Sequence, residues 1–450
     1  MTDVALALFT RDLRVHDNPV LVEAAKARHV VPLFVLDEAI AGFRNPNKAA
    51  FLRDCLEDLD AELQDRGAGL VVRRGHPVEE VRRLAARAGA EEVHVAADVS
   101  GYAQAREQAL AEGLEEDGRR LVVHDGSITA VPPGAVTPSG KDHAAVFTPY
   151  YRRWARTRLR TPLAAPRTLT LPDGVTPGRL PDPEALGGGP TAQHLPRGGE
   201  REARRRLAAW VRAVEGYADG HDDLAGDRTS RLSPYLHFGC LSPAEVVARV
   251  GRDGEGAEAF VRQIAWRDFH HQMLAARPEV SVHDYRPRDD RWRRDEDAFG
   301  AWCEGRTGYP IVDAGMRQLA AEGWMHNRAR LLVASFLTKT LYLDWRLGAR
   351  HFLDHLLDGD VANNQLNWQW VAGTGADTRP NRVLNPLRQA ERFDPEGEYV
   401  RRYVPELRGV EGSAVHQPWK LPEEQRRALD YPDRIVDHDE AAAAFRQARS

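Results

Sequence analysis

The chain has 450 residues, of which 42% are apolar, and a formal net charge of −5. This length allows two or three domains with substantial cores, and this apolar fraction is that of a globular protein rather than a disordered one. With three widely spaced cysteines, no basic leader and no long apolar run, we expect a soluble cytoplasmic protein without a disulfide framework or a membrane span.

The charge is distributed unevenly along the chain. Residues 1–130 contain 16 Lys and Arg against 23 Asp and Glu, whereas the remainder contains 46 against 44. If the protein binds a polyanion, we therefore expect it on the C-terminal part.

The first 130 residues alternate between apolar, β-branched runs and helix-like stretches. The stretch at 49–67 places Phe51, Cys55, Leu59 and Leu63 on one helix face, and Gly67 closes it. This alternation predicts an α/β domain over 1–130, with a doubly wound, Rossmann-like parallel sheet that binds ligands at the carboxyl ends of its strands. Neither a G-x-G-x-x-G nor a G-x-x-x-x-G-K-[ST] loop is present. The predicted strands are "VALALFT", "VVPLFVLD", "LVVRRG", "EEVHVAAD" and "RLVVHDG".

Residues 131–200 contain 12 of the 28 prolines and a "GGG" run, which predicts an interdomain linker over the surface. From 201 to 450 the helical period returns, and we predict an all-helical domain. One helix start is well marked, because Ser242 can cap it, Pro243 fits its first position and Glu245 completes a capping box.

The stretch "DRTSRLSP" supplies hydroxyls from Thr229, Ser230 and Ser233 and a cation from Arg231, just before a helix start. Free N–H groups at such a start can bind a phosphate or diphosphate. On these residues alone, a simple N-cap is the commoner interpretation.

The apolar helix "GWMHNRARLLVASF" is interrupted by Arg328 and Arg330. A buried arginine needs a carboxylate partner, and Asp358 or Asp360 of "DGDVANNQLNWQW" is the natural candidate. A structural ion pair does not explain why amides such as Asn327 also lie among apolar neighbours.

Seven of the ten tryptophans lie between 266 and 370. Each alone is best interpreted as a packing residue, but together they could stack a flat ligand or a nucleobase, or relay electrons. His351 and His355 have the spacing of zinc ligands, but no third ligand follows them. The pair His270 and His271 likewise does not indicate a metal site, so we predict none.

These residues lie in motifs through which the chain resembles the photolyase/cryptochrome family over nearly its whole length. The resemblance is closest to class I photolyases for cyclobutane pyrimidine dimers (CPD), of the actinobacterial deazaflavin type. The matching motifs are "FTRDLRVHDNP", "TSRLSPYLHFG", "WRDFHHQ", "GYPIVDAGMRQL", "GWMHNRARLL", "DGDVANNQLNWQWVAGTGAD" and "NPLRQAERFDPEGEYVRRYVPEL".

The resemblance implies a U-shaped FAD in the helical domain, used as FADH⁻. Asp358, paired with Arg330, would orient charge beside the flavin ring, and Asn364 matches the position that faces flavin N5. The implied FAD-binding residues are Tyr217, Thr229, Ser230, Arg231, Leu232, Ser233, Arg267, Asn327, Arg330, Asp358, Gly359, Asp360 and Asn364.

The same resemblance implies that light drives an electron from FADH⁻ into a dimer flipped out of UV-damaged DNA. Trp302, Trp345 and Trp368 match the family's relay, which reduces oxidised flavin from the surface inward. The implied catalytic residues are Gln263, Trp266, Asn327, Asn364 and Trp370, and the implied DNA contacts are His221, Gln263, Trp266, Arg267, Asn327, Arg328, Trp370, Arg382 and Gln389.

Three positions depart from the family's pattern. Gln263 replaces the usual Glu, which leaves a hydrogen-bonding amide without an acid, Leu331 replaces a frequent Met, and His221 replaces a phosphate-binding Arg.

The N-terminal sheet would hold an antenna chromophore, either 8-hydroxy-5-deazaflavin or, as the alternative, methenyltetrahydrofolate. The candidate contacts are Asp37, Lys48, Asp98 and His237, although Ser100 stands where a Glu contact often occurs.

The leading hypothesis is therefore a monomeric CPD repair enzyme that acts on UV-damaged DNA at the nucleoid, without an obligate protein partner. The main alternative is a cryptochrome-type photoreceptor without repair activity, which Asn364 and the complete pocket disfavour. A thermal flavin oxidoreductase would need a nicotinamide fingerprint, and a separate nucleotide-binding module would need residues 1–130 to bind nucleotide alone.

Overall fold

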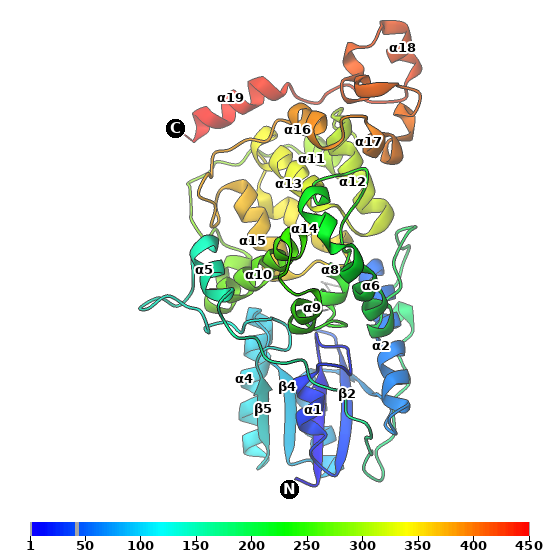
Figure 1. The fold of residues 1–450 in the computed structure, drawn as a ribbon, viewed down its shortest axis with the longest axis vertical. Helices are drawn as coiled ribbons and strands as arrows, with labels where there is room; N and C mark the ends of the chain where they lie inside the picture. Colours follow the sequence, from blue (N-terminus) through cyan, green and yellow to red (C-terminus); the bar gives the residue numbers. More distant parts are fainter. Residues whose placement is uncertain (1, 41–44, 450) are drawn as a thin grey trace.

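All five predicted strands form in the computed structural model, which describes residues 2–40 and 45–449. They pair in one parallel sheet of order β3-β2-β1-β4-β5 (Figure 1). Every residue of the central strand β1 is buried, as expected when helices cover both faces of a sheet. The strands are β1 (Val4–Phe9), β2 (His29–Asp37), β3 (Val71–Gly75), β4 (Glu92–Ala96) and β5 (Arg120–His124).

Four helices connect the strands. The helix predicted at 49–67 is confirmed as the longest of them, with Phe51, Cys55, Leu59 and Leu63 buried, and the chain turns away at Gly67, whose φ of 97° suits glycine. The four are α1 (Pro19–Ala24), α2 (Pro46–Gln64), α3 (Pro77–Ala88) and α4 (Gly101–Glu116).

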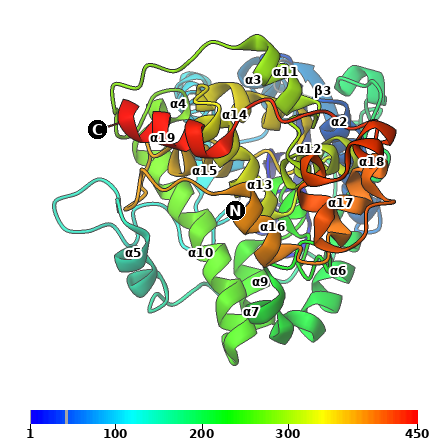
Figure 2. The same cartoon turned by 90° about the horizontal axis from the view of Figure 1, so that it is seen from above.

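The second part of the protein is helical from residue 200 onward, and its described residues contain no strand beyond one isolated bridge. The marked helix start is confirmed, because the Ser242 hydroxyl accepts a hydrogen bond from the Glu245 N–H at 3.4 Å. Figure 2 shows these helices from above. They are α6 (Glu200–Ala213), α7 (Tyr217–Gly220), α8 (Ser233–His237), α9 (Pro243–Val250), α10 (Glu255–Ala276), α11 (Glu296–Cys303), α12 (Pro310–Glu322), α13 (Asn327–Ser335), α14 (Trp345–His355), α15 (Val361–Ala372), α16 (Pro386–Phe393), α17 (Glu398–Tyr403), α18 (Glu423–Ala428) and α19 (His438–Ala448).

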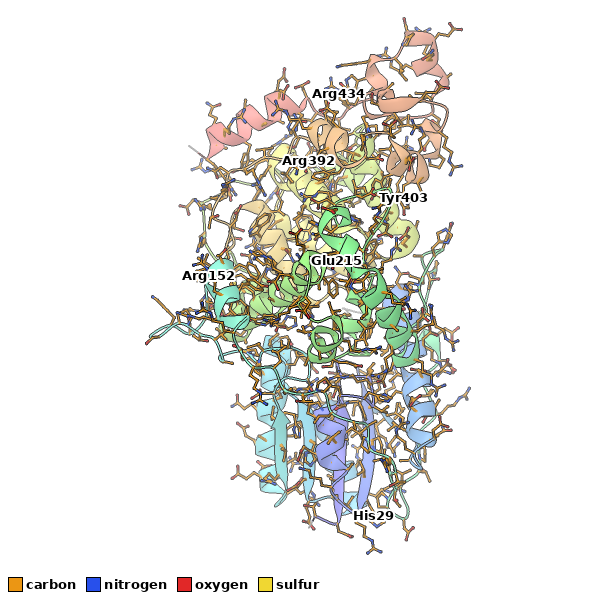
Figure 3. All side chains as sticks on the ribbon, viewed as in Figure 1. His29, Arg152, Glu215, Arg392, Tyr403 and Arg434 are labelled. Atoms are coloured by element: carbon orange, nitrogen blue, oxygen red, sulfur yellow. The ribbon has the colours of Figure 1, made fainter. Side chains whose placement is uncertain are left out.

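The proline-rich segment is more than a surface connector. It forms helix α5 (Phe147–Trp154), which lies against α10 at one side of the helical part (Figure 3, where Arg152 marks α5). Trp154 is fully buried and donates a hydrogen bond from its indole N–H to Asp268 at 2.9 Å. Pro149 lies in the first turn of α5, where proline is tolerated.

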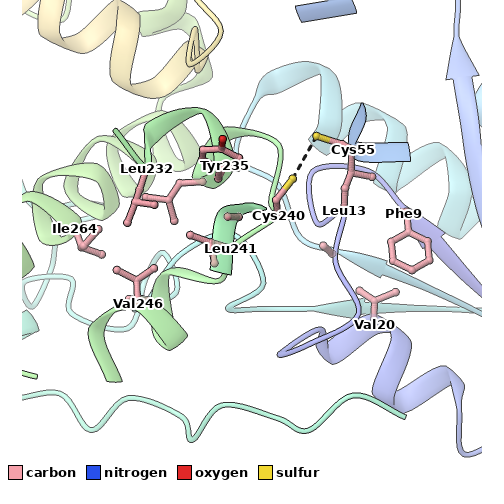
Figure 4. Close-up of a cluster of buried hydrophobic side chains, with 14 of the residues drawn as sticks. Phe9, Leu13, Val20, Cys55, Leu232, Tyr235, Cys240, Leu241, Val246 and Ile264 are labelled. Carbon is pink, nitrogen blue, oxygen red and sulfur yellow. Dashed lines mark hydrogen bonds between the residues drawn. The ribbon is translucent and has the colours of Figure 1, made fainter. Parts of the chain in front are cut away.

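One hydrophobic cluster spans the two parts (Figure 4). Phe9, Leu13 and Val20 of the α/β part belong to the same buried cluster as Leu241 and Ile264 of the helical part. At this boundary the sulfur atoms of the free Cys55 and Cys240 lie 3.3 Å apart. The fold class predicted from the sequence is confirmed. No helix within the described ranges is long and apolar enough to cross a membrane.

Candidate active site

A cavity of about 420 Å³ lies in the helical part, between α8, α10, α13 and α15. Its apolar walls come from Phe260, Ile264 and Leu331 together with the rings of Trp266 and Trp370. The residues predicted for the site that line this cavity are Tyr217, Ser230, Leu232, Ser233, His237, Gln263, Trp266, Arg267, Asn327, Arg330, Asp358, Asp360 and Trp370.

Three polar lining residues were missed, namely His270, Asn363 and Asn367. The two asparagines follow Asp360 at helical spacing, and one face of α15 therefore points into the cavity from Asp360 to Trp370. This spacing was visible in the sequence and could have identified both amides.

The acidic stretch before α15, residues 358–360, is fixed by hydrogen bonds. Arg330 pairs with one carboxylate oxygen of Asp358 at 2.8 Å, which confirms the predicted ion pair, and the other oxygen is buried without a partner. Asp360 caps α15 by accepting the Asn363 N–H at 2.8 Å. Arg328 pairs instead with Asp222, at 2.7 Å.

The charge state of the cavity follows from its burial. Burial raises the pKa of Asp360, but His271, Arg11 and Arg267 lower that pKa well below the usual range for a carboxyl. Burial also lowers the pKa of His270 to about 4. The cavity therefore presents an ionised carboxylate and a neutral imidazole at neutral pH.

The residues proposed for the diphosphate do not all face the cavity. Thr229 lines a second cavity of about 570 Å³, which shares Ser230 with the first. Arg231 pairs with Asp227 and, at 2.7 Å, with Glu322, and its guanidinium lies 4.2 Å from the centre of the Trp324 ring system.

Two further flavin candidates lie beside the cavity. Asn364 lines a smaller adjoining cavity of about 80 Å³, which shares Asn327 and Arg330 with the main one, and its amide N–H donates to the Ala349 carbonyl at 3.0 Å. Gly359 lies next to Lys48, whose Nζ would be 2.9 Å from a Cβ at this position.

The three tryptophans of the predicted relay are all buried. The rings of Trp302 and Trp368 lie 6.0 Å apart, and Trp345 donates its indole N–H to Asp284 at 2.8 Å. Half-buried Trp292, which the predicted relay does not include, packs on Tyr342 with ring centres 5.2 Å apart, and Tyr342 lies three positions before Trp345.

Two of the predicted DNA contacts, Arg382 and His221, lie against residues that line the cavity. Arg382 is exposed and lies 5.5 Å from the centre of the Trp370 ring system, while Gln389 has a buried side-chain oxygen without a partner. His221 packs its half-buried ring on Tyr217 at 5.2 Å, and its Nδ1 lies 3.0 Å from the Tyr217 carbonyl.

The four antenna candidates have different surroundings. His237 lines the main cavity, and Asp98 pairs with Arg11 at 3.2 Å. Lys48 donates to the Leu353 carbonyl at 3.1 Å, and Asp37 accepts a hydrogen bond from Tyr102.

Comparison with known proteins identifies the family. Residues 5–167 match the DNA photolyase family model, and residues 260–450 match the model for the FAD binding domain of DNA photolyase. A relative from Streptomyces griseus, named deoxyribodipyrimidine photo-lyase, is 61% identical, with 99% of each chain covered. The chain belongs to the DNA photolyase family.

Solved structures of the photolyase family agree with this assignment. A class III photolyase from Agrobacterium tumefaciens matches with a TM-score of 0.92 and 34% identity, over 100% of this chain and 97% of the other. A cryptochrome from Synechocystis matches with a TM-score of 0.92 and 28% identity, over 99% and 98%. A photolyase from Sulfolobus tokodaii, described with two FAD molecules, matches with a TM-score of 0.86 and 31% identity, over 99% of each chain.

The residues of the cavity fit the FAD of photolyases. A flavin is a flat ring edged with donors and acceptors, and here indole and aliphatic walls adjoin amides and carboxylates. The unpartnered oxygen of Asp358 offers a buried acceptor to such a ligand. In the described part of the chain, no group of three His, Cys, Asp or Glu side chains could hold a metal ion.

Proposed function

We propose that this protein repairs cyclobutane pyrimidine dimers in DNA with light, as a deoxyribodipyrimidine photo-lyase. The observation that supports this function best is that Trp266 and Trp370 line the same cavity as Asp358 and Asp360. Stacking walls for bases and polar groups for a flavin thus lie within one cavity. FAD, when bound in its reduced and excited form, supplies the electron that opens the dimer and takes it back.

The flavin would be held by the polar side of the cavity. Asp358, fixed by Arg330, offers its free oxygen to a ring N–H or a hydroxyl, and Asp360 stays ionised nearby. Ser230 and Ser233, with the remainder of 229–233 and Tyr217, would contact the diphosphate region. Asn364 would contribute through the adjoining cavity.

The dimer would enter between the two tryptophans. Trp266 and Trp370 would stack on it after it flips out of the duplex, and Gln263 and Asn327 would donate hydrogen bonds to its carbonyls. Arg382 and Arg328, with His221, Arg267 and Gln389, would contact flanking phosphates, which position the DNA without reading its sequence.

The tryptophan relay and the antenna complete the proposal. We propose electron transfer through Trp302, Trp345 and Trp368 to oxidised flavin, and 8-hydroxy-5-deazaflavin as the antenna, with methenyltetrahydrofolate as the alternative. Asp37, Lys48, Asp98 and His237 stay the proposed antenna contacts. The monomeric state, cytoplasmic location and class I deazaflavin subtype also remain predictions from the sequence.

Photorepair is the direct test. Purified protein with chemically reduced flavin is illuminated with blue light in the presence of an oligonucleotide that contains one thymine dimer. Recovery of thymine absorbance with reduced flavin regenerated establishes repair. Protein that binds and photoreduces flavin but leaves the dimer intact would instead be a cryptochrome-type photoreceptor.

A further inference from the structure

Arg11, a residue of the α/β domain, reaches the acidic stretch of the proposed flavin site. It follows the central strand β1, and Asp98 follows the neighbouring strand β4. The strand order reverses between these two strands, and open α/β sheets bind their ligands at this switch point. Here the helical domain occupies that position, because Arg11 pairs with Asp360 at the start of α15.

Each nitrogen of the Arg11 guanidinium has its own acceptor. Nη1 donates to Asp98 at 3.2 Å, Nη2 pairs with Asp360, and Nε donates to the His237 carbonyl at 3.4 Å. Only 23% of the side chain is exposed. A planar guanidinium with an acceptor at each nitrogen fixes the carboxylates that it holds.

The surroundings of Asp360 show why Arg11 matters. The carboxylate is buried and lines the main cavity, and its other basic neighbours come from different elements. His271 of α10 lies 3.5 Å away, and Arg267 and Lys48 act at longer range. Among the described residues, Arg11 is the only lysine or arginine that forms an ion pair with Asp360.

We infer that Arg11 is a positioning residue of the flavin site, which holds the Asp360 carboxylate and balances its charge from the neighbouring domain. The inference rests on the proposed function, because Asp360 lines the cavity proposed for FAD. A carboxylate without its cation would disfavour added negative charge on a nearby flavin. Arg11 therefore favours reduced over oxidised flavin.

The test is the midpoint potential of the bound flavin, measured by spectroelectrochemical titration of the full-length holoprotein in the dark. Arg11→Gln should shift the potential to more negative values, with reduced FAD bound about tenfold more weakly relative to oxidised FAD. Asp98→Asn removes an anion that competes for Arg11, and it should shift the potential in the opposite direction. Arg74→Gln is the matched control, because Arg74, which lies on strand β3, forms an exposed ion pair with Glu38.

Opposite shifts in the two variants, with none in the control, support the inference even if both variants lower the melting temperature. Unchanged potentials, or shifts of the same sign in both variants, overturn it, and Arg11 is then only an interdomain tether. If wild-type protein binds no flavin, the proposed function falls together with this inference. Bound flavin with unchanged potentials removes the inference alone.

Discussion

Gln263 is the residue whose chemistry departs most from the family's pattern. It is exposed at the mouth of the cavity, where an amide can donate a hydrogen bond to a pyrimidine carbonyl. Loss of one such bond costs about 1 kcal/mol, so Gln263→Ala should weaken dimer binding by about fivefold. Binding to a dimer oligonucleotide in the dark measures this change.

Gln108→Ala serves as the control for Gln263, because Gln108 is an exposed glutamine on α4, far along the chain from the cavity. Equal dimer affinity in Gln263→Ala and Gln108→Ala would show that the amide makes no contact with the dimer.

Asp358 is held by a cation inside the cavity. Asp358→Asn leaves Arg330 without its carboxylate and weakens the acceptor offered to flavin, so FAD affinity should fall at least about tenfold. Equilibrium dialysis against FAD measures the change. Asp222→Asn is the control, because it breaks a comparable ion pair with Arg328 that does not involve Asp358. This variant should bind FAD with wild-type affinity. Equal losses in both variants would contradict a specific role for Asp358.

A relay that begins at the surface needs an accessible end, and Trp302, Trp345 and Trp368 are all buried. Half-buried Trp292 can provide that end. We expect Trp292→Phe to slow photoreduction of oxidised flavin while repair by chemically reduced enzyme stays unchanged. Flash photolysis measures the first rate. If Trp302→Phe slows photoreduction and Trp292→Phe does not, the electron enters elsewhere.

Among the elements, α5 has a role that its proline-rich surroundings concealed. Phe147 stacks on Trp266 with ring centres 3.6 Å apart and planes within 7°, so α5 supports one wall of the cavity from outside. Phe147→Ala should lower the free energy of unfolding by about 3 kcal/mol and weaken dimer binding, while FAD is retained. Urea unfolding and dark binding to the dimer measure these effects.

The more conservative Phe147→Leu keeps most of the buried volume and should recover most of the stability but not the flat contact. If both variants bind the dimer as wild type does, α5 contributes to the fold alone.

The sheet was predictable because each strand is a short apolar run with its own turn signals, such as those before Val71 and after Phe9. In helix α15 the spacing of Asp360, Asn363, Asn367 and Trp370 is equally local, although it was not used to predict the helix. In contrast, α5 depends on aromatic contacts with α10, which lies more than 100 residues later, and no local pattern reveals them. The antenna candidates were taken from motif positions, and no local pattern reveals that Asp98 and the His237 carbonyl both contact Arg11.

For the whole molecule, buried neutral histidines link stability to pH. Burial lowers the pKa of His270, His326 and His351 to about 4, whereas an unfolded histidine titrates near 6.5. Between these values the unfolded chain binds more protons, so the melting temperature should fall as pH falls from about 6.5 to about 4. Calorimetry of the holoprotein across this range measures the slope.

A substitution separates this effect from that of the carboxylates. His326 caps α13 by accepting the Arg328 N–H at 3.2 Å, and Asn can replace it in that role without taking up a proton. His326→Asn should therefore flatten the slope. A slope equal to that of wild type would assign the acid sensitivity to other groups.

The pairing of Arg11 with Asp360 joins residues 349 positions apart. During synthesis the whole α/β domain leaves the ribosome long before residue 360, so Arg11 first meets Asp98 alone. The acidic stretch is added only after every strand of the sheet has been synthesised. A chain stopped before residue 358 would lack Asp358, Asp360 and Trp370, and with them one side of the cavity proposed for FAD.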